Sequence, residues 1–90
     1  MDELLTVFSL ETPVRYGGCG RLAFIAGRKV GNAVVRNRCK RVVREAVRRA
    51  SGPWPGRDIA FIARPGLLRA DADDLDRSLA RHLRRLGVSP

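Results

Sequence analysis

The segment from Gly31 to Arg49, GNAVVRNRCKRVVREAVRR, repeats small apolar residues at the period of an α-helix. These residues share one helical face: Val35, Cys39, Val42, Val43, Ala46, Val47 and Ala50. Polar and basic residues share the opposite face: Asn37, Arg38, Lys40, Arg41, Arg44 and Arg48. Asn32 is a good N-cap, and Ser51, Gly52 and Pro53 end the helix. A helix of this kind has to bury its apolar face, and small Val and Ala side chains suit packing on a sheet.

Shorter apolar runs surround this helix and predict a small sheet. Residues 4–10 (LLTVFSL), 21–26 (RLAFIA) and 58–64 (DIAFIAR) have the composition of strands. The glycine-rich loop between the first two predicts a hairpin in which they are antiparallel neighbours. Residues 71–86 predict a second amphipathic helix, with acids in its first turns and arginines after them. Trp54, between two prolines, is interpreted as a packing anchor. The length of 90 residues allows one domain.

The charge of the chain is concentrated in one place. The net charge is +9, and the segment from Arg28 to Arg49 holds nine basic residues against one acid, Glu45. A solvated helix face would alternate acids and bases, because pairs of opposite sign four residues apart stabilise it. Arginine outnumbers lysine sixteen to two, which favours bidentate phosphate contacts, although a GC-rich genome gives the same bias. The segment therefore predicts a nucleic-acid-binding surface.

Other classes of function lack support in the sequence. The apolar helix face has no Trp, Phe or Leu to enter lipid, and no apolar run approaches a membrane span, so no membrane partner is expected. GRKVGN is not a Walker loop, and His82 has no second histidine or cysteine near it in sequence. Cys19 and Cys39 form no metal-binding spacing and are expected to be reduced. The N-terminus lacks a signal peptide, which predicts a cytoplasmic protein.

The residues from Lys29 to Glu45 match the pattern KxGNAVxRNRxKRxxRE at every fixed position. By this motif the chain resembles the bacterial ribonuclease P protein component, the protein subunit of the ribozyme that removes 5′ leaders from precursor tRNA. The resemblance implies an α+β sandwich, with a mixed sheet packed by a long basic central helix and a C-terminal helix. It also implies a left-handed crossover around the central helix, whereas about 98% of such connections are right-handed. Residues 1–90 would form one RNA-binding domain that lacks the family's N-terminal helix and first strand. A misassigned start codon, a truncation or a naturally short form would each account for this difference.

The resemblance further implies a role in removing the leader as an accessory subunit of an endoribonuclease. The protein would bind the ribonuclease P RNA subunit and precursor tRNA, while the RNA performs Mg²⁺-dependent hydrolysis and the protein holds no cofactor or metal and has no catalytic residue. Phe8 would line the cleft for the single-stranded leader, with core packing as the alternative. RNA contacts are expected at Arg28, Lys29, Asn32, Arg36, Asn37, Arg38, Lys40, Arg41, Arg44 and Arg48.

Two other binding functions remain as alternatives. A general RNA-binding or ribosome-associated structural domain would share this small α/β shape, because a fold alone does not define a function. A processing subunit bound to its RNA should prefer precursor over mature tRNA, which separates the two. A DNA-binding protein is less well supported, since nothing resembles the second helix of a helix-turn-helix motif or a dimerising zipper.

Overall fold

The computed structural model describes residues 3–13, 15 and 17–88, and all the predicted helices and strands are found within them. The elements follow the order β1 (Leu5–Glu11), β2 (Leu22–Ala26), α1 (Ala33–Arg49), β3 (Arg57–Ala63), a 3₁₀ helix η2 (Pro65–Arg69) and α2 (Ala72–Arg85). Each predicted element ends within about one residue of its observed bounds, whereas η2 was not predicted. In this part of the chain no helix combines the length and apolar character needed to cross a membrane.

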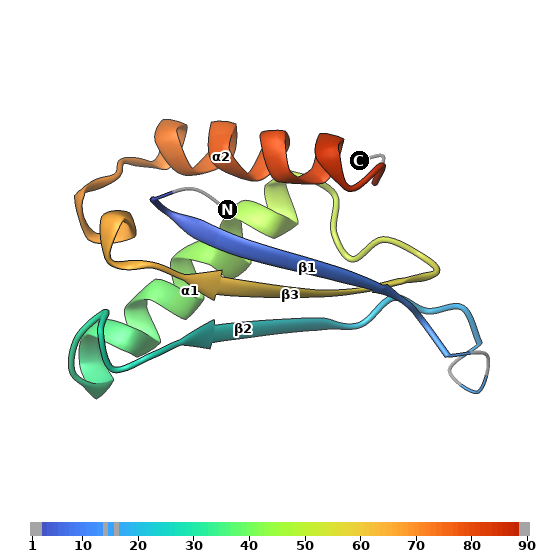
Figure 1. The fold of residues 1–90 in the computed structure, drawn as a ribbon, viewed down its shortest axis with the longest axis horizontal. Coiled ribbons are helices and arrows are strands. Elements are labelled where there is room, and N and C mark those ends of the chain that lie inside the picture. Colours follow the sequence, from blue (N-terminus) through green and yellow to red (C-terminus); the bar gives the residue numbers. More distant parts are fainter. Residues whose placement is uncertain (1–2, 14, 16, 89–90) are drawn as a thin grey trace.

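The three strands form one mixed sheet in the order β1-β3-β2 (Figure 1). β3 pairs antiparallel with β1 and parallel with β2. The predicted hairpin was therefore wrong, because β3 lies between the two strands that it would have joined. β3 is the strand best suited to the centre, since Ile59, Phe61 and Ala63 are all buried. The connection from β1 to β2 spans residues 12–21, longer than a tight hairpin loop, and crosses to the far edge of the sheet.

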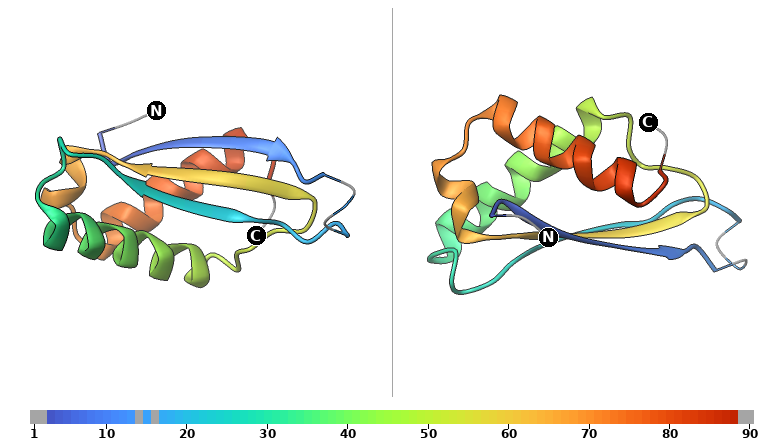
Figure 2. Two further views of the ribbon diagram at one scale, coloured as in Figure 1. Left: turned by 90° about the horizontal axis from the view of Figure 1, so that it is seen from below. Right: turned by 45° about the horizontal axis from the view of Figure 1, so that its top comes forward.

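Helix α1 connects the parallel strands β2 and β3 and packs on one face of the sheet. In Figure 1 the helix lies behind the sheet, and in the left view of Figure 2 it lies below it. Followed from β2 through α1 to β3, the chain makes a left-handed crossover, so the expectation from the resemblance is confirmed and the general rule fails here (Figure 1). α2 packs against α1 and β1 on the same side. Within the described residues, no helix covers the opposite face of the sheet.

The core lies between the sheet and the two helices. Leu5, Val7, Ile59, Phe61 and Ala63 of β1 and β3 alternate toward the helices, as expected for strands with one covered face. They meet apolar residues of both helices: Cys39, Val43, Ala46 and Val47 of α1, and Leu75, Leu79 and Leu83 of α2. Trp54 is buried with its ring 6.5 Å from that of Phe61, which confirms its interpretation as a packing anchor.

The start of α1 is defined by two adjacent residues. Gly31 has φ +154°, and a Cβ at this position would lie 2.9 Å from Cγ1 of Val35, so the turn requires glycine. The Oδ1 atom of Asn32 accepts a hydrogen bond from the Val35 amide at 3.0 Å, which confirms the predicted N-cap. Together these residues direct the chain from the β2 side of the molecule into the helix.

Candidate nucleic-acid interface

The outer face of α1, defined here as Asn37, Arg38, Arg41, Arg44 and Arg48, is exposed along the whole helix. Arg28 and Lys29 are also exposed, in the turn that precedes the helix. Arg36 and Lys40 are half-buried, so they lie at the border of this face. The periodicity of the sequence had placed Lys40 on the polar face itself. Arg36, Lys40 and Arg44 are spaced four residues apart and therefore lie on the same flank of the helix. The structure thus brings the predicted basic residues together along one side of the molecule.

Among the described residues, no ion pair neutralises the positive charge of the outer face. The ion pairs Arg21–Asp58, Arg49–Asp76 and Arg77–Asp74 all lie outside it. Arg49 contacts Asp76 of α2 at 2.8 Å, and this hydrogen bond raises the pKa of its guanidinium. Arg49 therefore differs in role from the residues of the outer face. Arg49 joins α1 to α2, whereas the outer face stays available to a polyanion.

Arg44 lies over an aromatic ring of the sheet. Its guanidinium carbon is 5.2 Å from the ring centroid of Phe24 in β2, the geometry of a cation–π contact. Phe24 in turn stacks on Phe61, with centroids 5.6 Å apart and planes 13° from parallel. Sequence reasoning missed this contact, because it depends on which strand lies beneath the helix. The contact restricts the position of Arg44 relative to the sheet.

The face of the sheet opposite α1 carries exposed apolar side chains. Phe8 is 57% exposed, and Leu10 and Ile25 are exposed on the same face. Core packing of Phe8 is therefore excluded. Phe8 pairs in register with Ala60, which pairs with Ala23, so two small residues lie beside the ring. A hollow of about 350 Å³ is found here, lined by Phe8, Leu10, Arg21, Leu22, Ala23, Asp58, Ile59 and Ala60.

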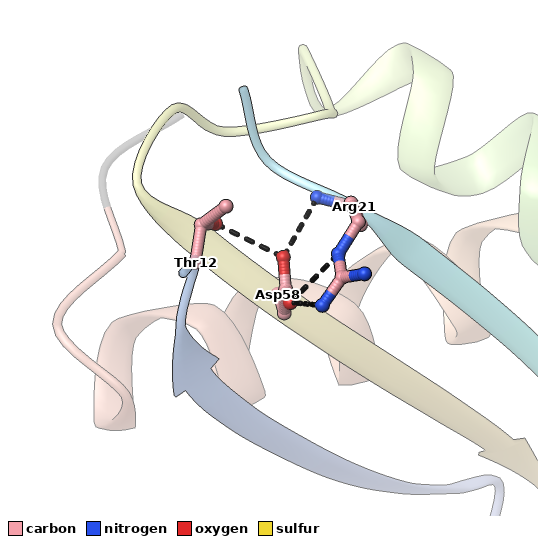
Figure 3. A network of polar contacts seen from close by, with 3 residues as sticks. All are labelled: Thr12, Arg21 and Asp58. Carbon is pink, nitrogen blue, oxygen red and sulfur yellow. Dashed lines mark hydrogen bonds and ion pairs between the residues drawn. The ribbon is translucent and has the colours of Figure 1, made fainter. Parts of the chain in front are cut away.

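Arg21 and Asp58, which line this hollow, form a polar network with Thr12 (Figure 3). Oδ1 of Asp58 accepts hydrogen bonds from Oγ1 of Thr12 at 2.9 Å and from the backbone amide of Arg21 at 3.1 Å. Its Oδ2 accepts from Nε and Nη2 of Arg21, the first at 2.9 Å. The Arg21 hydrogen bonds, followed by that of Thr12, lower the pKa of the Asp58 carboxyl. The network was not predicted, and it joins the ends of all three strands.

Two kinds of titratable group lie outside these surfaces, a buried histidine and two cysteines. Nη2 of Arg85 lies 2.8 Å from Nδ1 of the buried His82, and because a guanidinium only donates, Nδ1 is the acceptor. Cys19 is exposed and Cys39 is buried, and both are free thiols. Burial raises the pKa of Cys39, while Arg38 opposes this shift. Over the described residues, no group of three or more His, Cys, Asp or Glu side chains is placed to hold a metal ion.

With its left-handed crossover, cationic helix face and open apolar sheet face, the chain is a small α+β protein whose surface suits a polyanionic ligand. Residues 3–87 match the family model described as Ribonuclease P. The chain therefore belongs to the ribonuclease P protein family, which confirms the resemblance seen in the motif from Lys29 to Glu45.

Individual relatives agree with this assignment. The ribonuclease P protein component of Brevibacillus brevis is 45% identical over 74 residues, which are 77% of this chain and 59% of that protein. The component of Clostridioides difficile is 32% identical over 90 residues, covering 98% of this chain and 76% of the relative. Among solved structures, the Staphylococcus aureus RNase P protein has a TM-score of 0.81 at 26% identity, covering 100% of this chain and 81% of that one. The Thermotoga maritima protein has a TM-score of 0.77 at 33% identity, covering 94% and 79%.

Proposed function

We propose that this protein is the protein subunit of ribonuclease P and promotes removal of the 5′ leader from precursor tRNA. The outer face of α1 binds the catalytic RNA, and the open sheet face around Phe8 receives the single-stranded leader. The observation that carries this proposal is the unneutralised cationic face of α1 in a member of this family. Counterions released from each neutralised phosphate supply the free energy of RNA binding.

The division of labour within the holoenzyme is inferred from membership of the ribonuclease P protein family. The RNA subunit performs the hydrolysis and uses the Mg²⁺ ions, while the protein itself holds no cofactor. The protein offsets part of the repulsion between the RNA subunit and the precursor, and thereby lowers the Mg²⁺ concentration that the holoenzyme needs. This activity belongs in the cytoplasm, where precursor tRNA is processed.

The proposed RNA contacts fall into three groups by position. Arg38, Arg41 and Arg48 are exposed and contact phosphates directly. Arg36, Lys40 and Arg44 lie toward the sheet and contact RNA that passes along that flank of α1. Arg28, Lys29 and Asn37 extend the surface to the N-terminal end of the helix. At this end the side-chain oxygen of Asn32 caps the helix, so only its amide nitrogen is left to contact RNA.

Reconstitution with the cognate RNA subunit tests the proposal directly. Cleavage of precursor tRNA is measured at limiting Mg²⁺ with and without the protein, and we expect the protein to increase the rate. A rate that does not depend on the protein at any Mg²⁺ concentration would reject the proposed function.

The salt dependence of RNA binding locates the contact surface. Arg38→Ala together with Arg41→Ala is expected to reduce the slope of log K against log salt by roughly one to two units, at about 0.7 to 0.9 per lost phosphate contact. Arg77→Ala together with Arg84→Ala removes the same charge from α2 and is the matched control. An equal reduction in both double variants would show that the helix contributes only net charge.

A further inference from the structure

A second hollow lies between α1 and η2, on the flank of α1 opposite Arg44. It has a volume of about 240 Å³ and is lined by Val35, Arg38, Cys39, Val42, Leu67, Leu68 and Ala70. The walls are aliphatic apart from the Cys39 thiol, and Arg38 supplies the one charged group in the lining. Because Arg38 also belongs to the outer face of α1, the hollow is continuous with the cationic surface.

The two leucines of η2 differ in environment. Leu67 is buried in the core, whereas its neighbour Leu68 is 52% exposed and lines the hollow. Cys39 also lines the hollow and is 5% exposed, so its thiol lies deep in the wall. The site therefore combines an apolar wall with an exposed edge at Leu68.

The charge beside the hollow indicates which ligand it suits. Arg38 forms no ion pair with any described residue, and its planar guanidinium can stack on a flat group or contact a phosphate. Proteins that recognise single-stranded RNA stack unstacked bases on aromatic rings or on guanidinium planes. Enzymes that extrude a base from a duplex also hold it between apolar side chains. An unpaired nucleotide uses both parts of the site, its base in the hollow and its phosphate on the outer face.

We propose that the hollow between α1 and η2 accepts one unpaired nucleobase of the RNA that is bound to the outer face of α1. Arg38 stacks on the base or holds its phosphate, and Leu68 covers the edge of the ring. The inference rests on the proposed function, since it assigns a nucleotide contact within the same RNA complex. It places a contact with a base beside a surface that otherwise contacts phosphates.

Equilibrium binding of the full-length protein to the ribonuclease P RNA, without tRNA, tests this site over a range of salt concentrations. Leu68→Ser is expected to weaken binding about three- to tenfold, by the same factor at every salt concentration, because an apolar contact releases no counterions. Ile25→Ser is the matched control, since Ile25 is 46% exposed on the opposite face of the sheet, lines neither hollow, and meets no leader in an assay without tRNA. We expect Ile25→Ser to change the affinity less than twofold and Leu68→Met to bind like the wild type. Wild-type affinity in Leu68→Ser, or an equal loss in Ile25→Ser, would overturn the proposal.

Alkylation of Cys39 by iodoacetamide gives an independent measurement. In a Cys19→Ser protein, saturating ribonuclease P RNA is expected to slow modification of Cys39 at least tenfold, and Leu68→Ser is expected to restore part of the rate. Equal rates with and without RNA would show that the hollow stays empty. Because these measurements require RNA binding by the wild type, loss of the base site is distinguishable from failure of the proposed function, in which the wild type neither binds the RNA nor stimulates cleavage.

Discussion

Asp58 joins three segments that are distant in sequence. Its carboxylate accepts hydrogen bonds from Thr12, which follows β1, and from Arg21, which precedes β2, while Asp58 itself lies in β3. Neither β1 nor β2 is linked to β3 by a short turn. The Asp58 carboxylate therefore holds the ends of these strands beside β3 through hydrogen bonds. The ionised form of Asp58 is thus part of the folded structure.

Asp58→Asn should lower the Tm at neutral pH and have a smaller effect in acid. The folded-state pKa of Asp58 lies below the ordinary value of an aspartate, so this contribution to stability is present above the unfolded-state pKa and is lost as pH falls through the folded-state pKa. Thermal unfolding of both proteins from pH 7 to pH 3 should show their Tm values converging as pH falls. Asp73→Asn, an exposed acid in the first turn of α2, controls for loss of one negative charge. A Tm difference that stays constant over this range would contradict the assignment.

Phe24→Leu should affect both stability and RNA binding. Loss of the stack on Phe61 is expected to reduce the free energy of unfolding by about 1–2 kcal/mol. Loss of the contact with Arg44, worth about 0.5–1 kcal/mol, should raise the Kd for the RNA subunit about two- to fivefold. The two effects are separated by a double-mutant cycle. In an Arg44→Ala protein, Phe24→Leu should still reduce stability but should no longer change the Kd; an undiminished effect on the Kd would show that Phe24 does not act through Arg44.

At the scale of elements, α1 is held on both flanks by different interactions. Arg44 contacts Phe24 of the sheet on one flank, and Arg49 contacts Asp76 of α2 on the other. The bounds of α1 and its cap were predictable, because they depend on residues near in sequence such as Asn32. The half-burial of Arg36 and Lys40 was not, because it depends on the neighbouring strand. The wrong hairpin has the same cause, since strand order is decided by pairing between distant segments.

Substitutions of Asn32 should separate helix capping from RNA binding. Asn32→Ala removes the acceptor for the Val35 amide and is expected to cost about 1 kcal/mol of stability, or about 4–8 °C in Tm. Asn32→Asp keeps the acceptor and places a negative charge at the positive end of the helix, so its Tm should match or exceed that of the wild type. The same charge lies next to RNA phosphates, so Asn32→Asp should bind RNA more weakly, most of all at low salt. Wild-type affinity in Asn32→Asp would place this end of the helix outside the RNA interface.

In the whole molecule, the two surfaces proposed for RNA lie on opposite sides of the sheet. Helix α1 lies on one side of the sheet (Figure 2), and its outer face points away from the sheet. Phe8 is exposed on the other side. β2 forms the edge between them, and the flank of α1 that carries Arg44 reaches this strand. In the proposed complex the catalytic RNA and the leader would therefore lie on opposite sides of the sheet, with the β2 edge between them. The motif predicted the basic surface, whereas the η2 hollow and the Asp58 network could not be predicted, because each is assembled from separate elements.

Phe8→Ala should reduce the preference of the holoenzyme for precursor over mature tRNA. Stacking of one base is worth about 1–3 kcal/mol, so the Kd for precursor should rise about five- to hundredfold while the Kd for mature tRNA stays the same. Binding of both tRNAs to the reconstituted holoenzyme measures the ratio. Equal weakening of both tRNAs would contradict a leader contact at Phe8. A wild-type holoenzyme without any preference would instead support the general RNA-binding alternative.

The position of β3 at the centre of the sheet has a consequence for how the protein is made. β1 and β2 are synthesised first, but each pairs only with β3, which follows the long helix in sequence. A nascent chain that ends before Arg57 therefore has no strand pair to form, and the apolar face of α1 has no completed sheet to cover. Because all pairing is between distant segments, folding of the sheet waits for the last third of the chain. Until then the nascent chain, which already carries most of the basic residues of the protein, is exposed to cellular RNA before its sheet has formed.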